Sequence, residues 1–403
     1  MQSFRERVEA ELRSDILTFW LKHSVDEQFG GFRGQISNDL TIDPLAHKGL
    51  ILNARILWTF AKAFSVYGET AYLETGRRAL DYLNRYFWDA HCGGLFWMVD
   101  HLGHPVDTKK RIYGQAFTIY ALAECHRATG DEGALKRAIE IFSAIETASH
   151  DAIHHGYFET CERDWTLSSE QRLSKVDMEA AKSMNTHLHL LEAYSNLLRC
   201  HDNPELRRCL KELIQVFLEQ IIDRNTHHFR MYFDAEWNSQ SDHISFGHDV
   251  EGSWLLCEAA ETLGDEPLLL EIKAEALKMA QAVLQQGIDS DGGLLYEANS
   301  SGIIDTNKHW WPQAEAVVAF LNAYQLSGQA RFYQAAVNTW EFIEKYIVDQ
   351  KYGEWYWRVS REGVPNDDEY KVGAWKCPYH NARMCFEVMA RLDKIGNLQT
   401  PMV

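Results

Sequence analysis

The sequence of 403 residues has little proline and no segment that separates one domain from another. Only 8 residues are proline, and neither a Pro/Ser-rich linker nor a block of like charges divides the chain, although a chain of this length would often hold two or three domains. Hydrophobic residues make up 46% of the sequence, which suits a large buried core. We therefore expect a single domain over residues 1–403.

Positive charge is also scarce. The 40 Lys and Arg residues against 58 Asp and Glu give a net charge of −18, which argues against nucleic acid or an anionic membrane surface as a partner, because phosphate binding needs a basic face. No run of about 18 apolar residues predicts a membrane span. Residues 1–7 lack the apolar core of a signal peptide. These absences predict a cytoplasmic protein.

Several chemical signatures are missing as well. The eight cysteines form no Cys-x-x-Cys pair and are expected to be reduced thiols. The glycine-rich nucleotide loops and the Gly-x-Ser-x-Gly elbow are absent. His248 and Glu251 stand three apart and would make half of a metal site, but no third ligand stands at a recognisable spacing. We expect neither a cofactor nor a metal.

What the sequence does contain is a motif that returns about every sixty residues. A glycine pair, or a glycine next to an aromatic residue, introduces a short extended stretch. Anchors at positions 31, 94, 156, 229, 293 and 353, where the copy near 229 lacks glycine, give spacings of 63, 62, 73, 64 and 60 residues. Six units of similar length indicate a repeat architecture.

Helical periodicity appears twice in each unit. The expected helices cover residues 3–23, 48–67, 70–87, 113–128, 131–148, 185–200, 204–222, 248–263, 266–286, 311–326, 329–347 and 380–393. The even-numbered helices are the more apolar, whereas the odd-numbered ones carry a charged stripe, so we expect six inner and six outer helices. The fold class predicted is all-α, an (α/α)6 barrel of six helical hairpins with short β segments in the loops at the mouth. An open solenoid is the alternative.

Polar side chains gather near the N-terminal ends of the inner helices. They are Arg55, Tyr113, Asn185, His189, His248, Glu251, Trp311, Glu315, His380 and Asn381. In a ring of parallel inner helices these ends share one mouth, where unpaired backbone N–H groups and positive helix-dipole ends also gather. A developing oxyanion is favoured in such a place.

Each residue alone also has a structural explanation. His248 and Glu251 could belong to a capped helix start, and Asn185 and His189 could be satisfied core residues that share one helical face. Tryptophan faces stack on sugars, yet tryptophans are also common in cores. We favour sugar binding for Trp311 and Trp375 only.

Taken together, six stretches resemble the N-acylglucosamine 2-epimerase superfamily. They are residues 53–58, 113–117, 182–189, 247–254, 309–316 and 376–381, which span essentially the whole chain in order. The Trp-Trp-Pro-Gln-Ala-Glu and Cys-Pro-Tyr-His-Asn forms resemble the branch that acts on cellobiose. The resemblance implies an isomerase that inverts carbon 2 of the reducing-end glucose of cellobiose or lactose, giving mannose at that end, without metal or nucleotide.

The resemblance also implies roles for individual residues. His248 and His380 match the pair of general acid/bases, His189 the histidine of ring opening and closing, Glu251 the carboxylate that supports His248, and Arg55 the guanidinium near the oxygens of carbons 1 and 2. The implied substrate-binding residues are Tyr113, Asp177, Asn185, Trp311, Glu315 and Trp375.

Chemistry agrees with these roles. Histidine suits proton removal on one face and proton return on the other, because its pKa lies near operating pH, and a guanidinium stabilises the enediolate. The alternatives are an N-acylglucosamine 2-epimerase or a mannose isomerase, an inverting glycoside hydrolase built on two carboxyl groups, and a sugar-binding scaffold. We expect a monomer or weak homodimer that binds a small oligosaccharide.

Overall fold

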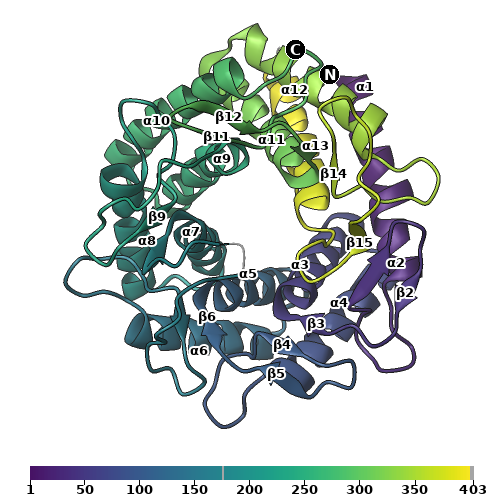
Figure 1. Ribbon diagram of the computed structural model, residues 1–403, viewed down its shortest axis with the longest axis vertical. Coiled ribbons are helices and arrows are strands. Elements are labelled where there is room, and N and C mark those ends of the chain that lie inside the picture. The colour runs from purple at the N-terminus through teal and green to yellow at the C-terminus, as the bar shows by residue number, and fades with distance from the viewer. Residues whose placement is uncertain (175–176, 400–403) are drawn as a thin grey trace.

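The inner wall of the protein is a ring of six helices. The computed structural model describes residues 1–174 and 177–399, and Figure 1 shows the ring from its open face. The inner helices are α3 (Leu50–Tyr67), α5 (Ile112–Thr129), α7 (Met184–Leu198), α9 (Phe246–Leu263), α11 (Trp310–Ser327) and α13 (His380–Gln399). Each packs against the next in chain order. They are apolar on most sides, and in α5 every residue from Ile112 to Cys125 is buried.

The outer wall is formed by the other member of each hairpin. It comprises α1 (Gln2–Ala10), η1 (Glu11–Leu17) and α2 (Thr18–His23), then α4 (Thr70–Tyr82) with η2 (Leu83–Phe87), α6 (Glu132–Ala148), α8 (Pro204–Val216) with η3 (Phe217–Ile221), α10 (Glu266–Gln286), and α12 (Ala330–Phe342) with η4 (Ile343–Ile347). The η segments are π-helical continuations of the helices before them. The predicted helix boundaries agree with these to within a few residues, apart from the last helix, which continues to Gln399. Among the described residues no helix is long and apolar enough to cross a membrane.

The ring is closed. Trp58 of α3 meets Phe386 of α13 with ring centroids 6.4 Å apart, and the Thr59 hydroxyl donates to the carbonyl of Pro378 at 3.0 Å. Helix α1, at the start of the chain, packs on α13, the last inner helix (Figure 1). These contacts confirm the predicted (α/α)6 barrel over the open solenoid.

Short antiparallel strands form the rim of one face. They are β1 (Gln35–Ser37), β2 (Ile42–Asp43), β3 (Lys48–Gly49), β4 (Met98–Val99), β5 (Pro105–Asp107), β6 (Lys110–Arg111), β7 (Thr160–Cys161), β8 (Lys182–Ser183), β9 (Tyr232–Phe233), β10 (Ile244–Ser245), β11 (Glu297–Asn299), β12 (Gly302–Asp305), β13 (Lys308–His309), β14 (Arg358–Val359) and β15 (Tyr370–Val372). Strand β15 pairs with β1, so the last loop joins the first and the rim closes as the helices do.

The repeated glycine motif is a tight turn held by the inner helix that follows it. Each turn closes with an antiparallel bridge, as between Val25 and Phe32 in the first unit. In α5, α7, α9 and α11 the fourth residue of the helix bonds back to the turn. For example, His187 Nε2 accepts the N–H of Tyr157 at 2.9 Å and Asp249 Oδ1 accepts the N–H of Phe229 at 2.7 Å. His187 therefore faces the loops and not the axis.

A buried ion pair links most turns to the strand before the inner helix. In the first unit, Lys48 Nζ lies 2.7 Å from Asp26 Oδ2 and donates to the carbonyl of Gly30 at 2.7 Å. Lys182 and Asp151 repeat the pair at 2.8 Å in the third unit, whereas Ile244 replaces the lysine in the fourth. The pair fixes the loop against the helix that carries the polar residues.

We expect Lys48→Met to lower the free energy of unfolding by about 3–5 kcal/mol, because it leaves the Asp26 carboxylate buried without its cation. Burial alone would raise the pKa of Asp26, but Lys48 and backbone N–H groups lower it. The loss should therefore be largest above the ordinary aspartate pKa and shrink as the pH falls below it. Urea unfolding measures it, with Lys273→Met, which breaks an exposed pair with Glu261, as a control that costs about 1 kcal/mol or less. Equal losses in the two variants would show that the buried pair does not hold the turn.

Candidate active site

The inner helices bring one equivalent residue each to the barrel axis. These residues stand five positions after the start of α3, α5, α7, α9 and α11, and at the corresponding place in α13. They are Arg55, Phe117, His189, Glu251, Glu315 and Arg383. Several neighbours in this ring contact one another: Arg55 lies 4.1 Å from the centroid of the Phe117 ring, which lies 4.5 Å from that of His189, and Glu315 lies 2.7 Å from Arg383. The repeat geometry thus converts six separated positions into one cluster.

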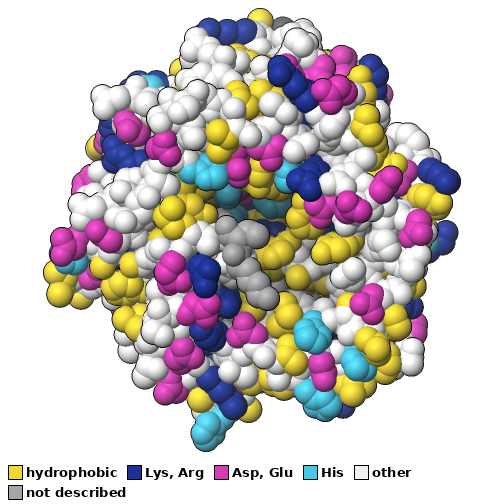
Figure 2. Space-filling view, in the orientation of Figure 1, with side chains coloured by type: hydrophobic (Ala, Val, Ile, Leu, Met, Phe, Trp, Pro, Cys, Tyr) yellow, Lys and Arg dark blue, Asp and Glu magenta, His cyan; other side chains and the backbone are white. Residues whose placement is uncertain are grey.

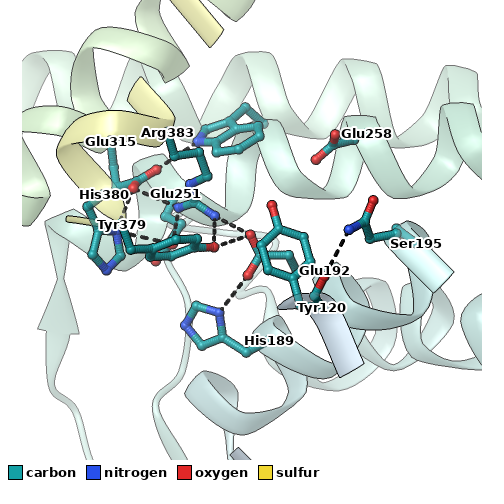
Figure 3. Close-up of polar contacts among 12 residues, drawn as sticks. Tyr120, His189, Glu192, Ser195, Glu251, Glu258, Glu315, Tyr379, His380 and Arg383 are labelled. Carbon is teal, nitrogen blue, oxygen red and sulfur yellow. Dashed lines mark hydrogen bonds and ion pairs between the residues drawn. The ribbon is translucent and has the colours of Figure 1, made fainter. Parts of the chain in front are cut away.

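Arg383 is the centre of this cluster, and its side chain is 2% exposed. Its Nη2 lies 2.5 Å from Glu251 Oε1 and 2.7 Å from Glu315 Oε1, while its Nη1 bonds to Glu192 Oε1 and to the hydroxyl of Tyr379 (Figure 3). One guanidinium therefore holds three carboxylates from α7, α9 and α11. Because guanidinium stays protonated in proteins, its charge is permanent.

His380 is oriented by Glu315. Its Nδ1 lies 2.6 Å from Glu315 Oε1, so Nδ1 donates and Nε2 is left as the basic nitrogen. Burial, together with Arg55 and Arg383 nearby, holds the pKa of His380 well below its usual range. His380 is accordingly a neutral base near pH 7. Glu315, which the family resemblance casts as a substrate contact, instead supports this histidine and also accepts the indole N–H of Trp254 at 3.0 Å.

His248 has a different partner from the one expected. Its Nδ1 is hydrogen-bonded to Ser245 Oγ at 2.8 Å, whereas Glu251 bonds to Arg383 and lies 3.8 Å from His380 Nδ1. The prediction that Glu251 supports His248 is therefore wrong, because Arg383 from the opposing helix takes up the carboxylate. Burial lowers the pKa of His248 to about 3, helped by His189 and His243.

His189 is positioned by a carboxylate on its own helix. Its Nδ1 lies 3.0 Å from Glu192 Oε2, one turn further along α7. Although burial raises the pKa of Glu192, Arg383 and His189 lower it to about 2. Glu192 is therefore ionised at neutral pH and fixes the ring of His189 through a charged acceptor.

The pKa of Glu251 is shifted in the opposite direction from that of Glu192. Burial, reinforced by the charge of Glu315, raises the pKa of Glu251 to about 7. Its Oε2 is buried and has no hydrogen-bond partner within the described part of the chain, yet the residue lines a cavity. The carboxyl group is thus available to exchange a proton with whatever occupies that cavity.

Arg55 carries a buried charge with no acid beside it. It is 3% exposed, donates to the Tyr113 hydroxyl at 2.9 Å and lies 3.7 Å from the Cys377 thiol. Its other contacts are the ring faces of Phe117 and Tyr379. No carboxylate among the described residues forms an ion pair with Arg55. An isolated buried cation of this kind is suited to a developing oxyanion.

These groups surround one cavity at the mouth of the barrel. Its volume is about 250 Å³, and Figure 2 shows the hollow at the centre of the open face, with histidine and hydrophobic side chains on its walls. Of the eleven predicted site residues, the ten that line it are Arg55, Tyr113, Asp177, Asn185, His189, His248, Glu251, Trp311, Trp375 and His380. Glu315 is the eleventh and lies behind His380.

Aromatic rings shape this cavity. The Trp311 ring contacts both candidate bases, with its centroid 4.7 Å from that of His248 and 5.5 Å from that of His380. Trp375 packs 5.7 Å from both Tyr113 and Trp97. A second cavity of about 420 Å³ also has Trp375 in its wall. The mouth therefore has room beyond the histidines.

Glu251, Glu315 and His380 also form a possible metal-ligand group, since their ligand atoms lie within 4.8 Å of one another. However, Arg383 Nη2 already contacts both carboxylates. A cation there would have to displace or repel the guanidinium, so this donor set fits a metal poorly.

Sequence reasoning missed Arg383, Glu192 and Ser245, and it also missed Tyr296 and Trp357 of the cavity wall. Superposing the six units would have found Arg383, because it occupies the repeat position of Arg55 and His189. Nothing in the spacing marks Ser245 as the partner of His248.

Comparisons with known proteins give a consistent result. The sequence matches the N-acylglucosamine 2-epimerase (GlcNAc 2-epimerase) family over residues 30–383. The cellobiose 2-epimerase of Bacteroides fragilis is 44% identical over 386 residues, 96% of this chain and 98% of that protein. The structure of cellobiose 2-epimerase from Bacillus thermoamylovorans B4167 superposes with a TM-score of 0.93 at 37% identity, covering 97% of this chain and all of that one. That from Spirochaeta thermophila superposes at 0.91 with 40% identity, covering 98% of each chain.

The lowered pKa values can be tested directly. We expect His248 and His380 to be neutral at pH 6, below the ordinary histidine pKa of 6.5, because a lowered pKa shifts protonation to lower pH. Nitrogen-15 NMR of the imidazole rings reports this. His150 is the internal control, since its hydrogen bond to Glu212 raises its pKa and should keep it charged at the same pH. Two charged rings at positions 248 and 380 would contradict the description of the site.

Proposed function

Because the chain belongs to the N-acylglucosamine 2-epimerase family, we propose that it is a cellobiose 2-epimerase, an isomerase that inverts carbon 2 of the reducing-end glucose of cellobiose and lactose. The observation that carries this proposal is the pair of neutral histidines, His248 and His380, that line one cavity together with Arg55. Two bases that flank one carbon, with a cation for the neighbouring oxygen, are what inversion through an enediolate requires.

The first step is opening of the sugar ring. His189 moves the proton of the carbon-1 hydroxyl to the ring oxygen, leaving an aldehyde at carbon 1. Glu192 holds His189 in one orientation for this transfer. No net proton is gained or lost, so the same histidine also closes the ring of the product.

The second step is removal of the proton from carbon 2. One of the two bases, His248 or His380, accepts the proton, and the electron pair moves into the carbonyl to give an enediolate. Arg55, buried and free of any acid in the described residues, stabilises the oxygen that becomes negative. Phe117 and Tyr379 shield the guanidinium from water, which strengthens this interaction.

The third step is proton return on the opposite face by the other histidine, which must then be charged. Glu251, with a pKa of about 7, is half-protonated near neutral pH and lines the same cavity as both histidines. Because Nδ1 of His380 already carries a proton toward Glu315, a proton held by Glu251 reaches the basic nitrogen of the returning histidine through that cavity. Glu315 keeps the His380 ring in position as the proton moves.

The residue that favours a disaccharide substrate is Trp375, in the wall of the cavity. Trp375 lines both the 250 Å³ cavity and the 420 Å³ cavity outside it, so its ring stands where a second sugar continues from the first. Stacking on a sugar face does not select one hydroxyl orientation. Cellobiose and lactose, which differ in the non-reducing sugar, should both be accepted.

An inverting hydrolase fits the site less well. Such an enzyme needs two carboxyl groups roughly 6.5–9.5 Å apart across the scissile bond. Glu251 and Glu315 instead contact the same nitrogen of Arg383, at 2.5 and 2.7 Å. An epimerase or isomerase of N-acylglucosamine or mannose remains the second candidate, because the same three steps serve a monosaccharide.

Proton NMR of sugars incubated with the protein in deuterium oxide tests the proposal. From cellobiose we expect a product with mannose at the reducing end and deuterium at carbon 2. Cellobiose and lactose should react faster than glucose, mannose or N-acetylglucosamine. Release of free glucose would replace the proposal by hydrolysis, and a faster reaction with any monosaccharide would favour the second candidate.

Glu315→Gln should reduce kcat about 10²–10⁴-fold while KM changes little, because the His380 imidazolium loses its anionic partner. Steady-state kinetics on cellobiose measures the change. Glu258→Gln is the matched control, since Glu258 lies on the same barrel but pairs with Arg199 away from the cluster (Figure 3). A Glu315→Gln enzyme with full kcat would remove Glu315 from the mechanism.

We also propose that the reaction needs no metal, because Arg55 supplies the positive charge. Activity should survive exhaustive dialysis against a chelator, and Arg55→Lys should lose most of kcat because lysine lacks the planar fork. If added zinc or manganese alone restored the activity of the dialysed enzyme, Arg55 would not be the electrophile.

A further inference from the structure

Two turns of the barrel carry a histidine where the other four carry glycine. The first position of the glycine turn has a left-handed backbone in all six units, with φ between 60° and 88°. The occupants are Gly30, Gly93, His155, His227, Gly292 and Gly353. Glycine adopts this conformation without steric cost, whereas a histidine is strained there.

The loop imposes this conformation at position 155. The N–H of His155 donates to the Asp151 carbonyl at 2.8 Å, and its carbonyl accepts from Lys182 Nζ at 2.7 Å. Gly30 makes the corresponding bonds to Asp26 and Lys48 in the first unit. The backbone of residue 155 is therefore fixed by hydrogen bonds on both sides, and glycine would adopt this conformation with less strain than histidine.

The side chain of His155 lies close to a second histidine and to a carboxylate. His150 stands before the same turn, at a position that is apolar in the other five units, where the residues are Val25, Trp88, Ile222, Ile288 and Val348. Both histidines approach one carboxylate oxygen, Glu212 Oε1 of α8, with His150 Nε2 at 2.5 Å and His155 Nδ1 at 3.4 Å. Two departures from the repeat thus meet at a single acid.

We propose that His150 Nε2, His155 Nδ1 and Glu212 form a binding site for a divalent late-transition-metal ion such as zinc. The three ligand atoms lie within 4.8 Å of one another. In a tetrahedral zinc site with bonds of about 2.0–2.1 Å, ligand atoms lie roughly 3.4 Å apart. His155 and Glu212 already have that spacing, and His150 reaches it by withdrawing less than 1 Å as the ion replaces the shared proton.

The surroundings define the class of ion. Two imidazoles and one carboxylate suit zinc, nickel or copper, whereas magnesium and calcium prefer oxygen ligands. The His155 side chain is 61% exposed, so water can fill the fourth position. Arg208 lies 3.2 Å from Glu212 Oε2 and is itself exposed, which lets it swing away from the ion.

The bound ion would stabilise the outer wall of the barrel. It would join the loop after α6 to helix α8, which belongs to the next hairpin. None of its three ligands lines the catalytic cavity. The expected consequence is resistance to unfolding, with catalysis unchanged.

The fourth unit supplies a natural control. His227 has the same left-handed backbone, with φ of 60°, and lies 2.6 Å from Glu275. Ile222 stands at the place of His150, and among the described residues His227 is the one histidine paired with Glu275. Two ligands of this kind bind zinc weakly.

Metal-free protein titrated with zinc chloride tests the site. Calorimetry should show one saturable site in the wild type, and zinc should raise the thermal unfolding midpoint. His155→Gly restores the repeat glycine, so it should fold, unfold at a higher temperature than the wild type without zinc, and lose the zinc response. His227→Gly should keep the response.

Zinc-edge anomalous diffraction of soaked crystals locates the ion. A peak bounded by His150, His155 and Glu212 is the expected result. The proposal is overturned if the wild type shows no saturable zinc binding, if His155→Gly keeps the zinc response, or if the only peak lies at Glu251, Glu315 and His380 of the catalytic cluster.

Discussion

The ion-pair network around Arg383 is the interaction on which the site depends. Three carboxylates from three inner helices meet at one guanidinium that is almost fully buried. Removing one partner from such a cluster costs about 3–5 kcal/mol, because an uncompensated charge remains in a dry interior. The network also divides the acids by function. Glu192 has a pKa of about 2, whereas Glu251 has a pKa of about 7, so one stays an anion and the other can carry a proton.

The barrel makes this network possible by placing equivalent positions of six helices around one axis. The units then separate structural duties from chemical ones. In α5, α7, α9 and α11 the fourth residue bonds to the glycine turn, as His187 and Asp249 do, and the sixth residue faces the axis, as His189 and Glu251 do. Whether a residue has a structural or a chemical role therefore depends on its position in the helix and not on its residue type.

Much of this arrangement could be predicted from the sequence. Six repeats and two apolar periodicities per repeat defined the ring, because helical hairpins bury their apolar faces only against neighbours. The cavity residues followed because His189, His248 and His380 stand near inner-helix N-termini that share one mouth. The partners of these residues could not be predicted in the same way.

Spacing along one helix shows which side chains share a face, but it does not show what the opposing helix offers. His248 and Glu251 stand three apart on α9, yet Glu251 bonds to Arg383 of α13 and His248 to Ser245. Glu315 turned from an expected substrate contact into the support of His380 for the same reason. Contacts between segments distant in sequence decide these pairs.

We propose that His248 and His380 act on opposite faces of carbon 2. Loss of carbon-2 deuterium to water, measured by NMR for deuterated cellobiose and for its deuterated mannose-ended epimer, tests it with His248→Asn and His380→Asn. Both variants should lose net epimerisation, one releasing deuterium from cellobiose only and the other from the epimer only. A variant that still interconverts the two sugars, or one that releases deuterium from both, would contradict the two-base account.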